Sequence, residues 1–128
     1  MPEEGLAVSV QQFIRAHIRS IEELEVLKTL RSNPTRAWTV GQIYDVVLTN
    51  RDSIANRLQN FCEGGLVLEM VSEPGTYRFA PRTAELARAA DETLEAYHTR
   101  SVLVLETIFK PSNESARNFA EAFRFKRK

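Results

Sequence analysis

The order of helix start and stop signals between residues 39 and 81 constrains the fold more than any other feature of this sequence. A helix-capping box is followed by a second N-cap residue, a pair of glycines and a Pro-Gly turn. These signals lie, in that order, at Thr39–Gln42, Asn50, Gly64-Gly65 and Pro74-Gly75. They separate two runs with helical periodicity from two strand-like runs. The pattern predicts helix, turn, helix and β-hairpin.

The apolar residues inside these segments indicate which faces are buried. The second helix places a core residue every three or four positions, at Ile54, Leu58 and Phe61. The first helix has an apolar face formed by Val40, Ile43, Val46 and Val47. The strand-like runs cover residues 66–71 and 76–80. Before them, Arg36-Ala37-Trp38 is too short for an independent strand but can pair with the hairpin.

Helices are also predicted on both sides of this central unit. An amphipathic helix covers 9–18, and a capping box formed by Ser20 and Glu23 starts another that Asn33-Pro34 ends. Thr83 starts a long helix that runs to Phe109, before Pro111. A last amphipathic helix is predicted to follow a cap at Ser112, with Ala116, Phe119, Ala120 and Phe123 on one face. The basic tail 124–128 ends the chain and is interpreted as a solvated terminus.

Composition excludes several classes of protein. Lysine plus arginine and aspartate plus glutamate both number 17, so the formal net charge is zero, which argues against a general polyanion binder. A single cysteine, Cys62, and two distant histidines, His17 and His98, leave no disulfide and no metal-ligand spacing, and no cofactor is expected. No apolar run approaches the ~18 residues of a membrane span, and the first residues are acidic where a signal peptide is basic. We expect a cytoplasmic protein without a membrane partner.

Two segments of the central unit resemble the winged helix-turn-helix regulators of bacteria, in the broad MarR/PadR-like sense. Residues 63–67 look like the step from the second helix into the wing, and residues 77–83 look like the exit from it. The chain is also similar to uncharacterised bacterial winged-helix proteins with an Ala-Phe-Arg-like tail. The resemblance covers roughly residues 20–109.

This resemblance implies a mainly α fold with a small antiparallel β-hairpin wing and a long C-terminal helix. It divides the chain into an N-terminal helical arm (1–19), a winged-helix domain (20–82) and C-terminal helices for dimerisation (83–128). It also implies transcription regulation, with the second helix of the pair and the hairpin meeting duplex DNA.

The second helix offers a polar surface for that role. If its apolar residues face the core, the rotation of 100° per residue places an outward stripe at Asp52, Asn56, Gln59 and Glu63, flanked by Ser53, Arg57 and Asn60. Amides can bond adenine edges, and an arginine can reach a guanine or a phosphate. The predicted DNA-contacting residues are therefore Asn56, Arg57, Gln59, Asn60 and Ser53, with Arg51, Arg78 and Arg82 directed to phosphates.

Charge leaves an alternative open. Between residues 36 and 82 the numbers of basic and acidic residues are equal. There are five arginines (Arg36, Arg51, Arg57, Arg78, Arg82) and five acids (Asp45, Asp52, Glu63, Glu69, Glu73). Phosphate contacts supply much of the affinity of DNA readers, and this unit has few cations to make them. The wing turn is also short and lacks the Asp/Arg-rich tip expected of a MarR-type wing. The alternative is a non-enzymatic interaction module, in which the same helix face meets a protein partner.

The long C-terminal helix is the predicted homodimer element. A coiled-coil seam is indicated by the four-three spacing of Ala90, Leu94, Tyr97, Ser101, Val104 and Ile108. Further apolar residues, Leu105 among them, lie on other sides of the helix. The predicted interface is formed by Leu94, Tyr97, Ser101, Val104, Leu105 and Ile108. The alternative is an ordinary buried core helix in a monomer.

No motif in the sequence indicates catalysis, and we expect no enzyme. There is no glycine-rich phosphate loop and no Cys–His or Ser–His arrangement within a recognisable motif. Glu22, Glu23 and Glu25 are interpreted as capping and solvated-face residues. Cys62 is interpreted as a small buried side chain, and Trp38 as a core anchor under the wing.

Overall fold

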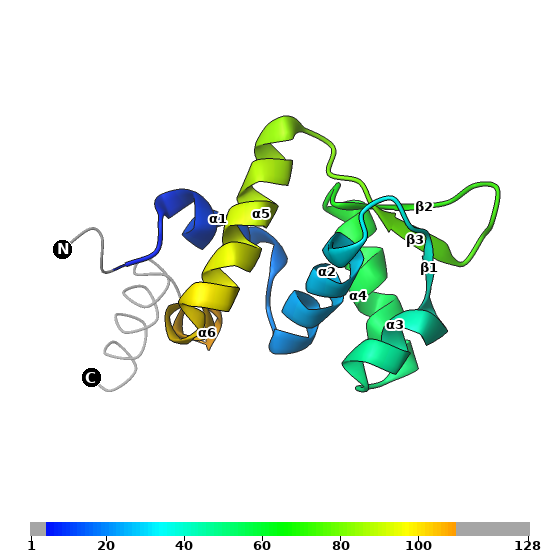
Figure 1. Ribbon diagram of the computed structural model, residues 1–128, viewed down its shortest axis with the longest axis horizontal. Coiled ribbons are helices and arrows are strands. Elements are labelled where there is room, and N and C mark those ends of the chain that lie inside the picture. The colour runs from blue at the N-terminus through cyan, green and yellow to red at the C-terminus, as the bar shows by residue number, and fades with distance from the viewer. Residues whose placement is uncertain (1–4, 110–128) are drawn as a thin grey trace, which may run out of the picture.

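The computed structural model describes residues 5–109, and its elements follow the predicted order (Figure 1). The elements are α1 (Val8–His17), α2 (Ile21–Ser32), β1 (Trp38–Thr39), α3 (Val40–Val47), α4 (Arg51–Glu63), β2 (Val67–Glu69), β3 (Thr76–Phe79), α5 (Ala84–Thr99) and α6 (Ser101–Phe109). The prediction of a mainly helical fold with a small antiparallel sheet is confirmed. The helix predicted after Ser112 lies outside the described residues.

Side-chain caps start four of the helices at the predicted residues. The hydroxyl oxygens of Ser20 and Thr83 and the side-chain oxygen of Asn50 each accept a backbone N–H from the first turn that follows. At Thr39 both halves of the capping box with Gln42 are present. Only one half of the capping box predicted at Ser20 is present, the hydrogen bond from the Glu23 N–H to the Ser20 side chain. The other half is wrong, because the Glu23 carboxylate accepts the backbone N–H of Arg19, at 2.6 Å, in place of that of Ser20.

The sheet has three strands in the order β1-β3-β2, and both pairings are antiparallel. In the register, Trp38 lies opposite Tyr77 and Val67 lies opposite Phe79. The strands are shorter than the predicted runs, because the turn from 70 to 75 closes early, with Gly75 at a φ of 86°. Successive side chains alternate between faces, so Trp38, Val67 and Phe79 enter the core from one face of the sheet.

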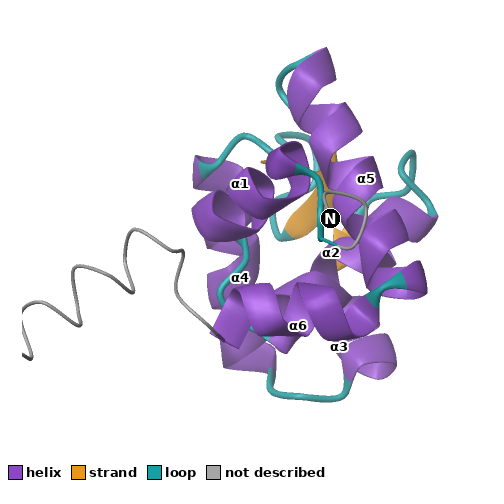
Figure 2. Cartoon of the chain, turned by 90° about the vertical axis from the view of Figure 1, so that its left-hand side faces the viewer, coloured by secondary structure: helices purple, strands orange, loops and turns teal. Residues whose placement is uncertain are grey.

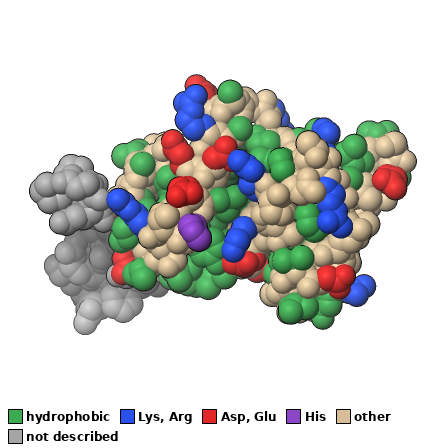
Figure 3. All heavy atoms as spheres, in the orientation of Figure 1, with side chains coloured by type: hydrophobic (Ala, Val, Ile, Leu, Met, Phe, Trp, Pro, Cys, Tyr) green, Lys and Arg blue, Asp and Glu red, His purple; other side chains and the backbone are tan. Residues whose placement is uncertain are grey.

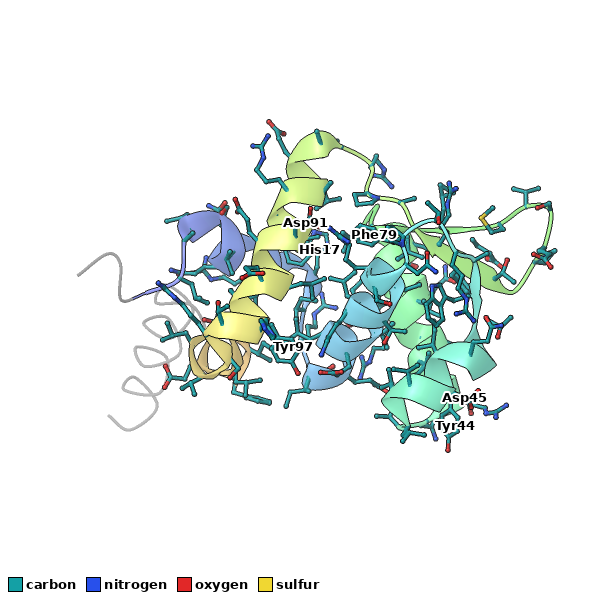
Figure 4. The ribbon with its side chains drawn as sticks, viewed as in Figure 1. His17, Tyr44, Asp45, Phe79, Asp91 and Tyr97 are labelled. Atoms are coloured by element: carbon teal, nitrogen blue, oxygen red, sulfur yellow. The ribbon has the colours of Figure 1, made fainter. Side chains whose placement is uncertain are left out.

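Helix α2 is central to the core. It packs against α3, α4 and β3, and Leu24, Val26, Leu27 and Leu30 on it are all fully buried. Helices α1, α5 and α6 form a second group, in which α1 packs on both α5 and α6 (Figure 1). Polar contacts bridge the two groups. Tyr97 projects from α5 toward α2, where its hydroxyl donates to Glu25 at 2.5 Å (Figure 4).

The prediction of one continuous helix from Thr83 to Phe109 is wrong. The chain leaves helical geometry at Arg100, where φ is −137° and ψ is 52°. As a result α6 is seen end-on in Figure 1, beside the lower end of α5, and lengthwise in Figure 2. The Arg100 guanidinium donates to the carbonyl of Gly5 at 3.0 Å, and the turn lets α6 pack on both α5 and α1. Val104 is thereby fully buried in the core of its own chain.

The buried face of helix α3 also differs from the predicted one. Ile43 is buried, and Val40 and Val47 pack against the core, but Val46 is 57% exposed. The helix is short and ends at Leu48, which has a left-handed φ of 62° and is itself 68% exposed. Positive φ is unfavourable for leucine. Here it ends α3 and leads the chain through Thr49 to the cap of α4.

Candidate nucleic-acid interface

Helix α4 has the two-sided character that the periodicity predicts. Ile54, Leu58 and Phe61 are at most 1% exposed, and they face the core. The opposite stripe is exposed and polar, and it consists of Asp52, Asn56, Gln59, Asn60 and Glu63. Asn50 caps the start of the helix, and Gly65, at a φ of 80°, turns the chain into β2. The helix therefore presents three amides and two carboxylates to solvent.

Two of the predicted contact residues are directed elsewhere. Arg57 and Ser53 are four residues apart, so they share one flank of α4, and that flank faces α2. The Nε of Arg57 donates to Glu22 at 2.9 Å, and the Ser53 hydroxyl donates to the same carboxylate oxygen at 2.5 Å. Arg57 and Ser53 therefore point toward α2, and they are not part of the surface that we expected them to share with Asn56.

Glu22 is the acceptor that joins α2 to the start of α4. Its second oxygen accepts the hydroxyl of Thr49, so three donors from the α3–α4 turn and α4 converge on one carboxylate. Burial acts to raise the pKa of Glu22, but the hydrogen bonds from Ser53, Thr49 and Arg57 outweigh it. The pKa consequently lies below its ordinary value. Glu22 is therefore ionised at neutral pH and holds α4 in place.

The other two glutamates of this segment are not solvated-face residues either. Glu23 is fully buried; one of its oxygens accepts the Arg19 N–H, and the other lies 3.8 Å from a terminal nitrogen of Arg57. Glu25 is half-buried and accepts the Tyr97 hydroxyl. The interpretation of Glu22, Glu23 and Glu25 as solvated acids is corrected, because all three make contacts within the protein.

The three arginines that we expected at phosphates lie in different places. Arg51 is exposed in the first turn of α4 and stacks over the Tyr44 ring, 4.9 Å from its centroid. Arg82 is exposed and lies over Gly65, close to the C-terminal end of α4. Arg78 is half-buried opposite Leu68, on the face of the sheet turned away from the core. Arg51 and Arg82 therefore flank the outward stripe at its two ends, and Arg78 does not join them.

The part of the wing from Leu68 to Gly75 has apolar and acidic side chains and no basic one. Leu68 is 49% and Val71 is 93% exposed, and the turn from 70 to 75 contains Glu73 and no basic residue. The carboxylate of Glu69 accepts the backbone N–H of Gly75 at 3.0 Å, which fixes the turn. Between the wing and α4 there is a groove of about 370 Å³, and Gln59 and Arg82 are among its lining residues.

Trp38 lies in the core, as the sequence predicts, whereas Cys62, which was predicted to be buried, is only half-buried. The Cys62 thiol is half-buried against the sheet, and burial together with the nearby Glu69 raises its pKa. Trp38 is 6% exposed, and the Arg36 guanidinium covers its ring at 3.9 Å from the centroid.

The predicted dimer residues are divided between core and surface. Val104 is buried in the core, and Tyr97 is engaged by Glu25, so neither is free to line a continuous seam. Leu94, Leu105 and Ile108 are half-buried, and Ser101 is exposed. The most exposed apolar side chains on α1 and α6 are Val8, Val102 and Phe109, each 65–66% exposed.

The described surface carries charges of both signs. On the face shown in Figure 3, Lys and Arg side chains are interspersed with Asp and Glu. Within residues 5–109, no group of three or more His, Cys, Asp and Glu residues is placed to hold a metal ion. Among the helices of this same region, none is both long and apolar enough to cross a membrane.

Comparison with known proteins bears on the fold. The sequence matches no protein-family model and no curated protein. The structure is similar to that of a mutant of S. aureus MepR, a MarR-family winged-helix regulator, with a TM-score of 0.52 and 11% identity over 93% of this chain and 88% of that chain. The fold is a winged helix. In it, α3 and α4 form the helix-turn-helix, and β2 and β3 form the wing.

Sequence reasoning missed the Glu22 contacts because they join residues 27–35 positions apart. One sequence signal pointed toward them. Ser53 and Arg57 form a donor pair on one flank of α4, and such a pair suits an acidic partner on a neighbouring helix. The partner itself is decided by how α2 crosses α4.

Proposed function

We propose that this chain is a DNA-binding transcriptional regulator that places the outward stripe of α4 in the major groove of a duplex. The observation that carries the proposal is the exposed amide set of Asn56, Gln59 and Asn60 on the second helix of a winged helix-turn-helix. In this arrangement the second helix is the one that enters the groove. Arg51 and Arg82, at the two ends of the stripe, supply phosphate contacts.

The proposal includes assembly as a homodimer through α1 and α6. These helices pack on each other and expose Val8, Val102 and Phe109, and the half-buried Leu105 and Ile108 lie on the same helix α6. A second copy that covered these side chains would remove apolar area from water. Two-fold symmetry would also present two α4 helices to the two halves of a palindromic site.

Selection from a random duplex pool at low and moderate salt tests the proposal. We expect an enriched motif whose affinity falls steeply with salt, with a slope of about 0.9 per phosphate contact. Arg51→Ala and Arg82→Ala should each reduce that slope by about one. Asn56→Ala and Gln59→Ala should each weaken binding by about 1–3 kcal/mol if they contact bases.

Asn33→Ala is the matched control, because Asn33 is an exposed amide that follows α2 and lies on none of the helices α1, α4 and α6. It should leave DNA affinity unchanged.

The exposed Asp52 and Glu63 favour the alternative, a protein-interaction module, since they repel phosphate and attract a basic protein. Absence of an enriched motif, together with no shift of bulk duplex at low salt, would support that alternative.

A further inference from the structure

We propose that Glu22 and Glu23 hold Arg57 out of the DNA interface, so that this protein reads its target through adenine and not through guanine. The inference rests on the proposed DNA-binding function and concerns which bases α4 can recognise. An arginine bonded to O6 and N7 of guanine is the commonest specific contact in the major groove, whereas Asn and Gln pair with N6 and N7 of adenine. Which side chains reach the groove therefore decides the class of sequence that is read.

Helix α4 contains two arginines and no lysine. Arg51 lies in the first turn, with its guanidinium over the Tyr44 ring, at the end of the stripe and not among the amides. Arg57 is the arginine next to Asn56 in the middle of the helix. It is thus the cation of α4 best placed along the helix to read a guanine beside the amides.

The contacts of Arg57 are made on the opposite flank. Its Nε donates to Glu22 at 2.9 Å, and a terminal nitrogen lies 3.8 Å from Glu23. The side chain is 30% exposed, compared with 12% for Glu22 and 0% for Glu23. The carboxylates of Glu22 and Glu23, both largely shielded from solvent, thus share one guanidinium.

Release of Arg57 to the groove would be unfavourable. Glu23 is fully buried, and the oxygen that faces Arg57 has no hydrogen-bond partner within the described residues, so the guanidinium is the nearest compensating cation there. Moving the guanidinium away leaves the buried Glu23 carboxylate without a cation. The Coulombic gain of Arg57 at an exposed phosphate does not offset that loss. The base-reading set that remains consists of Asn56, Gln59 and Asn60.

The test uses the full chain and the duplex enriched by selection from a random pool. Each adenine, and separately each guanine, is replaced by its 7-deaza analogue, which lacks the N7 acceptor. Fluorescence anisotropy then measures binding. We expect at least one 7-deazaadenine to weaken binding about fivefold or more. Every 7-deazaguanine should change affinity by less than twofold.

Substitution of Arg57 gives a second readout. Arg57→Gln combined with Glu22→Gln and Glu23→Gln removes the guanidinium and both of its carboxylate partners together, and the fold of the variant is checked by circular dichroism and thermal unfolding. The triple variant should keep the salt slope and the 7-deazaadenine pattern of the parent protein. A slope reduced by about one, or loss of a guanine dependence, would show that Arg57 contacts DNA.

The outcomes separate the two proposals. Binding that depends on guanine N7 overturns this inference and leaves the DNA-binding function standing. Failure to enrich any duplex overturns both. Because the analogue experiment uses the unmodified protein, it decides the question even where the Arg57 variant does not fold.

Discussion

The imidazole of His17, in the last turn of α1, lies against the backbone of Gly64, the residue that follows α4. A β-carbon at Gly64 would lie 2.9 Å from the Nδ1 atom of His17. The ring also stacks on Phe13, with the centroids 4.8 Å apart and the planes tilted by 41°. Burial and the nearby Arg19 lower the pKa of His17 despite Glu23, so the neutral ring is favoured. This contact ties the N-terminal helix to the end of the candidate DNA-reading helix.

Gly64→Ala is expected to destabilise the protein by about 1–3 kcal/mol, because the added methyl group overlaps the imidazole. Gly64 has a φ of −79°, so the backbone itself accepts alanine. In a His17→Ala background the same substitution should be neutral, or stabilising by up to about 1 kcal/mol. Urea unfolding of the four proteins measures the coupling. Equal costs in both backgrounds would contradict the contact as the cause.

Tyr97→Phe is expected to lower the free energy of unfolding by about 1–3 kcal/mol at pH 7, because the hydroxyl donates to a carboxylate. Burial and the Glu25 acceptor raise the pKa of Tyr97 to about 12 from its ordinary 10. The folded state holds this proton more tightly than the unfolded state. The contribution is therefore complete below pH 10 and is lost as the pH rises to about 12.

The measurement is the melting temperature between pH 9 and pH 12, a window that begins below the ordinary pKa of 10 and ends at the raised value of about 12. The variant should lose the steep part of the decline that the parent shows. Tyr77, whose pKa is also raised by burial, is present in both proteins and leaves a common background. Tyr44→Phe is the control. Parallel curves for the parent and Tyr97→Phe would refute the prediction.

Glu22→Gln is expected to destabilise the protein at neutral pH by about 1.5–3 kcal/mol, because it removes the charged acceptor of three hydrogen bonds. Since the pKa of Glu22 is lowered in the folded state, its contribution is present above the ordinary value of 4.5. It is lost as the pH falls through the lower, folded value. Acid unfolding should therefore show a weaker pH dependence below 4.5 in the variant.

Glu85→Gln is the matched control for this experiment. Glu85 also lies in the first turn of a helix, so both substitutions remove the same interaction with the helix dipole, but Glu85 is exposed. Its acid unfolding should follow that of the parent protein. An equal effect of the two substitutions would assign the stability to the dipole and not to the contacts with α4.

Val102→Glu combined with Phe109→Glu is expected to convert the proposed homodimer to a monomer, because two carboxylates would be buried at the interface. Val71→Glu on the wing is the control, since Val71 is 93% exposed and lies on a different element. Light scattering at high micromolar concentration provides the measurement. A monomeric parent protein under these conditions would exclude the dimer.

The sequence alone determined the order of the elements and the inner face of α4. Helix caps at Ser20, Thr39 and Asn50 act through side chains that bond a backbone group three residues away. The spacing of Ile54, Leu58 and Phe61 is likewise a property of one helix. Information of this kind lies within a few neighbouring residues, so it can be read without knowing how the helices pack.

Only the tertiary structure decided the break at Arg100 and the place of Arg57. The apolar residues on several sides of α6 suit either a straight helix with a partner or a bent one that packs on α1. The bend is selected by contacts with segments far away in the chain. Arg57 lies at the edge of the polar stripe by helix geometry, but its direction depends on Glu22, 35 residues earlier. The crossing of α2 over α4 brings the two together, and no pattern local to either helix specifies that crossing.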